Sequence, residues 1–325
     1  MRYIPNYKLS IIKEDEYESK IAAVETELNK VKQIGKFTAF DKTEIYYEYF
    51  LTENSKGNVV IVHGLSEFTR KFYELVFYTL NQGYNVFIYD QRCHGLSGRL
   101  TKINSLLHVD SFNDYVKDLA YFIDETVLKT EQKPIYLFAH SMGCATASLY
   151  MAKNKNKVKK AVFSAPMFEP VVKDVPIQIA RMGVSAAAFV LGKKRKFFLS
   201  DEFNPNVKFN YVYGLSKARF EHNMKLRKEN LCYQSTPLSL GWVKNSLTVS
   251  KKILSSRVAG EITTPILLLS AEKDKMVKNN LQQTFYKKCK TCSFECIENA
   301  THAVLASDEN ILFKVLNLSF NFFAM

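Results

Sequence analysis

The chain has 325 residues, of which 47% are hydrophobic and 24% charged, and its formal net charge is +13. This balance excludes a disordered or fibrous protein and predicts one large α/β core with one insertion. Although the pI is about 9.3, no recognition motif is present and the aromatic residues are not interleaved with Lys and Arg, so we expect no nucleic-acid partner.

The amino-terminal segment has no apolar core of signal-peptide length, so we expect no export. Residues 14–32 carry apolar side chains near helical spacing and predict an amphipathic helix. The longest strongly apolar stretch, Val184 to Gly192, is less than half the roughly 20 residues that span a bilayer. We therefore expect a cytoplasmic protein, with peripheral contact to the inner face of the membrane as an open alternative.

Two strand-like stretches, 34–40 and 44–50, open the fold, and from Val59 onward short, continuous apolar runs alternate with helical segments. Such runs indicate strands that are buried on both faces and joined by helical crossovers, so the pattern predicts a mostly parallel, doubly wound α/β sheet. The runs are 59–63, 86–90, 134–140, 160–166, 265–270 and 293–297. The intervening helices are 70–82, 111–128, 142–153, one after Asn280, and 310–323.

The alternation stops for roughly 90 residues after Met167, which predicts an insertion. The expected organisation is an amino-terminal helical extension (1–33), a core in two parts (34–166 and 258–325) and the insertion between them (167–257). Between Val171 and Gly260 there are 16 Lys and Arg against 5 Asp and Glu, so +11 of the net charge lies there. A field so concentrated favours an anionic partner such as a lipid surface.

Within the insertion, Pro176 begins a mostly apolar helical segment that ends at the basic residues Lys193, Lys194, Arg195 and Lys196. Such a helix can cover an acyl pocket as a lid, or it can lie in a bilayer interface with the cations facing the headgroups. Both interpretations stay open at this point.

The stretch FAHSMG places Ser141 between a buried strand and a helix, among the small residues Ala139, Gly143 and Ala145. A sharp strand-to-helix turn requires small neighbours, and it presents the hydroxyl at a helix amino terminus that favours developing negative charge. We therefore predict that Ser141 is a nucleophile, with an ordinary helix cap as the alternative.

A serine nucleophile needs a base and a carboxylate that orients the base, in the order Ser, acid, His for this fold. Only His222 and His302 follow Ser141, and His222 lies in the insertion, so His302 is the candidate base. The loop after the strand 265–270 offers Asp274 and Glu272. Asp274 is the better placed of the two to turn towards His302, and Glu272 remains the alternative.

Acyl transfer also requires two donors for the oxyanion. The first expected donor is the backbone N–H of Met142, and the second is that of Leu65, in the loop HGLSEF after an early strand. Gly64 allows this loop to approach the substrate, and His63 is expected to support the loop without reacting.

Together these stretches resemble α/β-hydrolases of the bacterial lysophospholipase and monoacylglycerol lipase group, often classed with serine aminopeptidases. The resembling blocks, from Val59 to the end of the chain, are HGLSEFTRKFYEL, DQRCHGLSGR, FNDYVKDL, AHSMG, SAPMF, LLLSAEKDKMV and ENATHAV.

The resemblance implies an α/β-hydrolase fold with a helical cap and cleavage of one acyl ester in a single-chain lipid. It places Ser141, Asp274 and His302 on the triad positions and Leu65 and Met142 on the oxyanion positions, and it implies no metal or organic cofactor. Two residues depart from the family pattern. Ala139 and Cys144 stand where glycines are common, and Cys144 is expected to narrow the pocket.

The function predicted from these observations is a serine hydrolase of lipid esters, a lysophospholipase in the first instance. Monoacylglycerol or another small ester is the nearest alternative substrate, and a peptidase is disfavoured because the insertion is short of acidic residues to bind a free amine. A non-catalytic lipid-binding module is the alternative from another class.

The three cysteines in the stretch CKTCSFEC (Cys289, Cys292 and Cys296) lack a fourth ligand that a metal site would need. We therefore expect free thiols there, in a reducing compartment.

Overall fold

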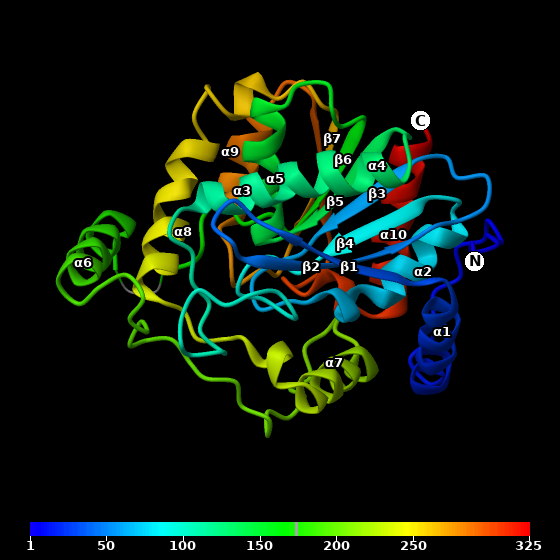
Figure 1. Cartoon of the computed structure of the whole chain (residues 1–325), viewed down its shortest axis with the longest axis horizontal. Helices are drawn as coiled ribbons and strands as arrows, with labels where there is room; N and C mark the ends of the chain where they lie inside the picture. The colour runs from blue at the N-terminus through cyan, green and yellow to red at the C-terminus, as the bar shows by residue number, and fades with distance from the viewer. Residues whose placement is uncertain (173–174) are drawn as a thin grey trace.

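Eight strands form one sheet in the computed structural model, which describes residues 1–172 and 175–325 (Figure 1). Lys173 and Asp174 of the expected insertion lie outside the described residues. The order of the strands is β1-β2-β4-β3-β5-β6-β7-β8. Their bounds are β1 Gln33–Thr38, β2 Glu44–Phe50, β3 Asn58–Val62, β4 Asn85–Tyr89, β5 Ile135–His140, β6 Lys160–Ser164, β7 Ile266–Ala271 and β8 Cys292–Ile297.

The strands from β4 to β8 across the sheet are parallel, and only β1 and β2 run antiparallel to their neighbours. Every residue of β3, β4, β5 and β7 is buried, as expected of strands covered on both faces. The predicted mostly parallel, doubly wound sheet is therefore confirmed. All parallel strands end at the same edge, which gathers the loops after β3, β5, β7 and β8.

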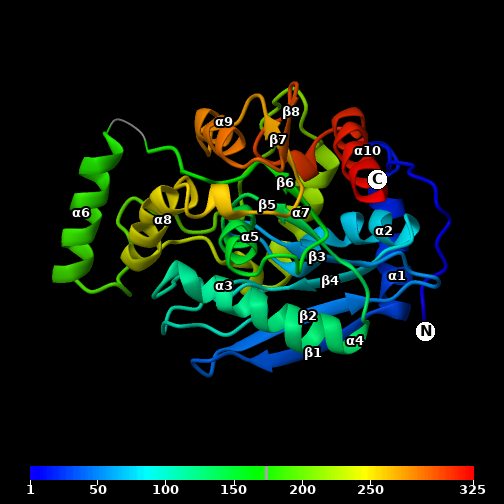
Figure 2. The ribbon, with the colours of Figure 1, turned by 90° about the horizontal axis from the view of Figure 1, so that it is seen from above.

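Helices cover both faces of the sheet (Figure 2). One hydrophobic core lies between the sheet and the helices α3, α5, α8 and α9, and the other lies between the sheet and α1, α2 and α10. The bounds are α1 Tyr17–Val31, α2 Tyr73–Asn81, α3 Phe112–Tyr121, α4 Leu128–Thr130, α5 Met142–Lys153, α6 Ile177–Val190, α7 Lys217–Glu229, α8 Leu240–Ile253, α9 Asn279–Lys288 and α10 Glu309–Ala324.

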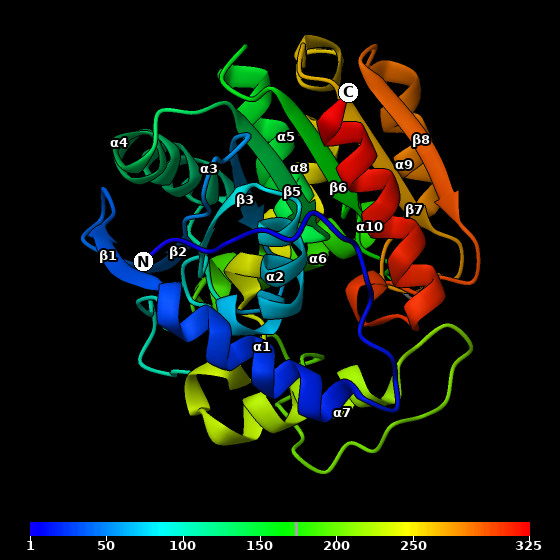
Figure 3. The same ribbon diagram turned by 90° about the vertical axis from the view of Figure 1, so that its right-hand side faces the viewer.

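The segment between β6 and β7 is helical and contributes no strand to the sheet in its described residues; it contains α6, α7 and α8. Helix α6 lies at the outer edge of the molecule beside α8 (Figures 1 and 2). Helix α7 packs against α1 of the amino-terminal extension (Figure 3). The insertion thus contacts the extension through α7, and it contacts α3 and α5 of the core through α8.

Candidate active site

Ser141 lies at a strained turn between β5 and α5. Its backbone has φ 51° and ψ −116°, a conformation that costs free energy for any residue with a side chain. The turn is held by hydrogen bonds: the Ser141 N–H donates to Ser164 O, and the Ser141 carbonyl accepts from the N–H groups of Cys144 and Met167, each at 3.0 Å. The serine is therefore fixed by its own backbone at the edge of the sheet where the parallel strands end.

Gly143 and Cys144 show how tightly α5 approaches the sheet. A methyl group on Gly143 would lie 2.0 Å from Val62 O, so only glycine fits there. The Cys144 side chain is fully buried, its Sγ lies 3.2 Å from Ala139 O, and burial raises the pKa of its thiol. The expected narrowing of the pocket by Cys144 is wrong, because this side chain fills the core under the turn.

His302 connects Ser141 to Asp274. Its Nε2 lies 2.9 Å from Ser141 Oγ, and its Nδ1 lies 2.7 Å from Asp274 Oδ2. The Asp274 side chain is fully buried, and its Oδ1 accepts from the N–H groups of Met276 and Val277, at 2.8 and 3.1 Å. These bonds leave the carboxylate one orientation, with Oδ2 facing the imidazole.

Glu272, the alternative acid, and His222, the histidine already set aside on sequence grounds, lie elsewhere. Glu272 accepts a hydrogen bond from the Asn299 N–H at 2.7 Å, on the outside of the same loop. His222, on α7, faces Glu25 of α1, with Nε2 3.5 Å from Oε1. Neither side chain takes part in the contacts around Ser141.

The loop after β3 is held so that one backbone N–H remains free. Gln91 Nε2 donates to His63 O, the Gly64 N–H donates to Glu67, and His63 Nδ1 lies 2.7 Å from Gly64 O. The Gln91 N–H donates to His63 Nε2 at 2.9 Å, so the ring carries its proton on Nδ1 and donates to Gly64 O. Burial lowers the pKa of His63 to about 4, which keeps it neutral near pH 7.

This arrangement orients the Leu65 N–H. The carbonyl of Gly64 and the N–H of Leu65 belong to one trans peptide and point in opposite directions, so fixing the first fixes the second. Among the described residues, the N–H groups of Leu65 and Met142 have no backbone or side-chain acceptor. A methyl group on Gly64 would lie 3.0 Å from Ser141 Cβ, which shows how closely the loop approaches the serine.

A hollow of about 540 Å³ lies beside His302 and Asp274. One wall comes from the insertion, where Asp308 N–H donates to Gly214 O and holds this stretch against the loop after β8. The lining residues are Val212, Leu215, Lys273, Asp274, Lys275, Met276, Thr301, His302 and Ala303. The candidate base is thus reached from a hollow that is partly apolar and partly cationic.

The sequence did not identify three buried residues near Ser141, namely Glu67, Gln91 and His140. His140 precedes the serine, and its ring centroid lies 5.3 Å from that of His302. Glu67 was the easiest to find, because it follows Gly64 by three residues in one short loop. Gln91 could not be found in this way, because its contact with His63 spans 28 residues of the chain.

Among residues 1–172 and 175–325, no three His, Cys, Asp or Glu side chains are grouped to hold a metal ion. The cysteines of the described chain are all free thiols, and Cys289 is buried while Cys296 is exposed. Within the same residues, no helix combines the length and apolarity needed to cross a membrane.

Comparison with known proteins gives the family. The family described as serine aminopeptidase, S33, matches residues 53–310, which is most of the chain. The chain belongs to this family. Its fold is the α/β-hydrolase fold, since solved α/β-hydrolases align with nine-tenths of it.

Two curated relatives match this chain over different lengths. Lysophospholipase L2 of Escherichia coli is 29% identical over 80% of this chain and 76% of the relative. Monoglyceride lipase of Saccharomyces cerevisiae is 28% identical over 39% of this chain and 42% of the relative, a shorter match. The family resemblance inferred from the sequence blocks is confirmed.

Solved structures share the fold of this S33 family member at low sequence identity. A soluble variant of monoglyceride lipase from Saccharomyces cerevisiae, in complex with a substrate analog, aligns with a TM-score of 0.69 and 16% identity over 90% of this chain and 92% of that chain. A thermostable carboxyl esterase from Bacillus coagulans aligns with a TM-score of 0.71 and 13% identity over 90% and 98%.

Proposed function

We propose that this chain is a lysophospholipase that cleaves the carboxylic ester of a single-chain lipid through Ser141, His302 and Asp274. At a coarser level the chain is an ester-hydrolysing enzyme, in keeping with its family and with relatives named for lipase activity. The observation that carries the proposed triad is the position of His302, within hydrogen-bond distance of both Ser141 Oγ and Asp274 Oδ2. The lysophospholipid substrate rests on the similarity to lysophospholipase L2.

The proposed reaction has two steps. Ser141 Oγ attacks the ester carbonyl while His302 Nε2 takes its proton, and the alcohol leaves after receiving that proton from the imidazolium. Water then attacks the acyl-serine by the same proton transfers and releases the fatty acid. Asp274 keeps the proton of the neutral imidazole on Nδ1 and stabilises the imidazolium, and the free N–H groups of Leu65 and Met142 bind the oxyanion in both steps.

Replacing the nucleophile tests this assignment. Ser141→Ala should lower hydrolysis of a lysophospholipid and of a short p-nitrophenyl ester by several orders of magnitude, because triad residues act as a unit. A fluorophosphonate should label the wild-type chain at Ser141 and leave the variant unlabelled. A loss of less than tenfold in a variant with an unchanged circular dichroism spectrum would remove Ser141 from the mechanism. A wild-type chain that takes no label would favour the non-catalytic alternative.

Monoacylglycerol is the second candidate substrate, favoured by the shorter match to the Saccharomyces cerevisiae enzyme. Paired assays with a lysophospholipid and a monoacylglycerol of the same acyl chain decide between them. A peptidase is disfavoured, because the hollow beside His302 presents Lys273 and Lys275 where a free amine would need acidic residues.

We further propose that α6 and the basic residues after it contact an anionic membrane surface. On α6, Val184 and Ala188 are buried against the core, whereas Phe189 is 90% exposed. The only charged residue of the helix, Arg181, donates to Leu247 O and is thereby turned towards α8. Other large exposed apolar residues lie on α6 and in the segment that follows it: Ile179, Met182, Val190, Leu191, Phe198 and Leu199.

Charge complementarity supports a bilayer with anionic headgroups as the occupant of this surface. Lys193, Lys194, Arg195 and Lys196 follow the helix directly and are all exposed. Each basic residue near such a surface contributes about 1 kcal/mol to binding. The helix would then lie in the interface with its apolar face buried. Of the two roles left open for α6, we favour membrane contact, because the helix lies at the outer edge of the molecule (Figure 1).

Sedimentation with vesicles tests this surface. The protein should bind phosphatidylcholine vesicles that contain phosphatidylglycerol. It should bind pure phosphatidylcholine vesicles much more weakly, and high salt should weaken its binding to both kinds of vesicle. Changing residues 193–196 to Gln should weaken binding by about 100-fold or more. The matched control changes four exposed lysines of the extension (Lys8, Lys13, Lys20 and Lys30) to Gln. Equal loss in both variants, or equal binding to both vesicle types, would refute the proposal.

A further inference from the structure

The hollow beside His302 carries two lysines. Lys273 and Lys275 flank Asp274 on the loop after β7, and both side chains line the hollow. The Asp274 carboxylate is buried and directed at His302, so it faces away from them. Lys273 Nζ contacts the neutral Asn299 Oδ1 at 2.6 Å and lies 5.2 Å from the centre of the Tyr213 ring. Among the described residues neither lysine forms an ion pair, so two positive charges remain uncompensated there.

A second feature is a polar group without a partner on a residue that lines the hollow. Thr301 Oγ is buried and, within the described residues, has no hydrogen-bond partner, although Thr301 lines the hollow and precedes His302. A buried hydroxyl without a partner costs free energy unless a bound group satisfies it. The other acid on this loop, Glu272, accepts from the Asn299 N–H and does not line the hollow.

The remaining walls are apolar and come from two segments far apart in the sequence. Val212 and Leu215 belong to the insertion, and Met276 belongs to the loop after β7. A ligand that matches this lining has anionic oxygens for the lysines and the hydroxyl, and a small apolar or glycerol body for the opposite wall. A phosphate ester of glycerol has this chemistry, whereas a neutral glycerol headgroup leaves both charges unmatched.

We propose that this hollow is the headgroup site, in which Lys273, Lys275 and the Thr301 hydroxyl bind the phosphate of a lysophospholipid. The proposal rests on the proposed hydrolase function and adds the residues that distinguish an anionic headgroup from a neutral one. Because His302 and Asp274 also line the hollow, the leaving alcohol would remain beside the base that protonates it.

Kinetics with matched substrates test the site. The substrates are a lysophospholipid and a monoacylglycerol with the same short acyl chain, both below their critical micelle concentrations, so that no lipid surface is present. In K273Q/K275Q, kcat/KM for the lysophospholipid should fall at least tenfold, while that for the monoacylglycerol should change less than twofold. The control is K290Q, an exposed lysine between α9 and β8. Equal changes for both substrates, or no change, would overturn the proposal.

Binding measurements keep the test independent of turnover. Calorimetry on Ser141→Ala should detect sn-glycerol 3-phosphate and show at least tenfold weaker binding when K273Q/K275Q is added. Glycerol and inorganic phosphate are the comparison ligands. Tighter binding of sn-glycerol 3-phosphate than of both comparison ligands would support a headgroup site. Equally tight binding of inorganic phosphate would refute the headgroup site. If these results hold but Ser141→Ala retains activity, the proposed mechanism fails and the anion site remains.

Discussion

Glu67 and His140 lie between the loop that carries Leu65 and the end of β5, directly before Ser141. Glu67 accepts from the Gly64 N–H, and its other oxygen contacts Lys71 Nζ at 2.5 Å and lies 3.8 Å from His140 Nε2. Burial alone would raise the pKa of Glu67, but Lys71 and His140 outweigh it and lower the pKa to about 2. Near neutral pH the carboxylate is therefore charged and able to hold the loop.

Removing this carboxylate should impair the chemical step more than substrate binding. In Glu67→Ala the Gly64 N–H loses its acceptor and the Leu65 N–H its fixed direction, so we expect kcat to fall about 10- to 100-fold with KM changed less than threefold. Glu67→Gln keeps an acceptor of the same size and should restore most of kcat. Steady-state kinetics with a p-nitrophenyl ester measure kcat and KM, and thermal unfolding of the same variants measures their stability. Together they separate the positioning role of Glu67 from a loss of stability. A rise in KM at constant kcat would argue against it.

His140 should make stability depend on pH. Burial lowers its pKa from 6.5 to about 4 in the folded chain. Between these values the unfolded chain binds a proton that the folded chain does not, so the free energy of unfolding should fall as pH decreases, by about 1.4 kcal/mol per pH unit for this group. His140→Gln should reduce the slope by that amount in urea titrations from pH 4.5 to 6.5. Identical slopes for variant and wild type would contradict the prediction.

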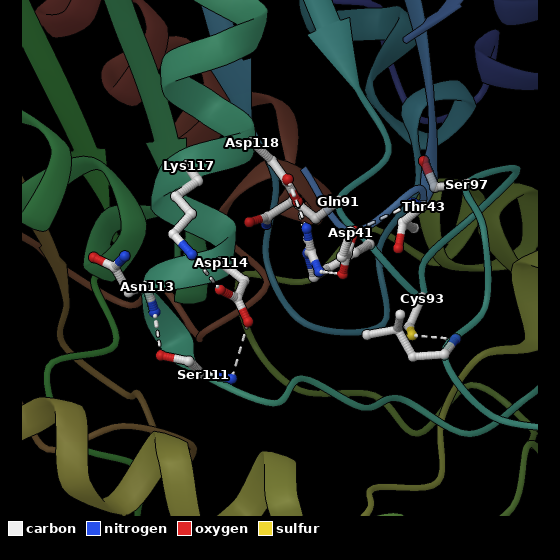
Figure 4. A network of polar contacts seen from close by, with 12 residues as sticks. Asp41, Thr43, Gln91, Cys93, Ser97, Ser111, Asn113, Asp114, Lys117 and Asp118 are labelled. Atoms are coloured by element: carbon white, nitrogen blue, oxygen red, sulfur yellow. Dashed lines mark hydrogen bonds and ion pairs between the residues drawn. The ribbon is translucent and has the colours of Figure 1, made fainter. Parts of the chain in front are cut away.

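At the scale of elements, a buried arginine joins the loop after β4 to helix α3. Arg92 donates two hydrogen bonds to Asp118 of α3 and one to Asp41 of the turn between β1 and β2, each at 2.7 Å. Figure 4 shows Asp41 and Asp118 meeting in this network, next to the capping box that Ser111 and Asp114 form at the start of α3. One guanidinium thus sets the relative positions of three elements.

Breaking this pair should be costly because it leaves the buried Arg92 guanidinium with only the partly exposed Asp41 as a partner. Asp118→Ala should lower the free energy of unfolding by about 3–5 kcal/mol. The double variant Arg92→Met with Asp118→Leu removes both charges and should be less destabilised than the single one. Urea unfolding of the three proteins measures this, and a double variant at least as unstable as Asp118→Ala would show that the pair itself contributes the stability.

At the scale of the molecule, the extension, the core and the insertion meet at Glu74 of α2. Arg219 of α7 donates two hydrogen bonds to Glu74, at 3.0 and 2.7 Å, and one to Ile12 O. Tyr17 of α1 and Tyr78 of α2 donate to the same carboxylate. The insertion is therefore clamped at α7, whereas α6 packs mainly against α8 (Figure 2).

Releasing the clamp should loosen α7. Glu74→Ala leaves the Arg219 guanidinium buried without its carboxylate, a change that costs about 3–5 kcal/mol. Limited proteolysis under native conditions should then cut first between residues 205 and 230, well before it cuts the core. Glu221→Ala, on the exposed face of α7, is the matched control and should leave the wild-type pattern. The same first cut in wild type and Glu74→Ala would show that α7 is held by other contacts.

Much of the fold was predictable because it follows from local patterns. Apolar runs marked all eight strands to within two residues, and the small residues around Ser141 marked the turn into α5, which begins at Met142 as predicted. Chain order then limited the candidate base to His302. The boundary between strand and helix is a property of neighbouring residues, so a sequence can reveal it.

The choice between Asp274 and Glu272 depended on a loop path that the local sequence leaves open. The same holds for Gln91 beside His63, for Arg219 beside Glu74 and for the lysines facing Val212, which are contacts between residues far apart in the chain. The sequence by itself determined the sheet, its crossovers and the residue types available at the catalytic edge, because periodicity and burial are encoded locally. Which of those residues meet was decided only by the tertiary structure, since hydrogen bonds at 3 Å depend on how distant segments pack.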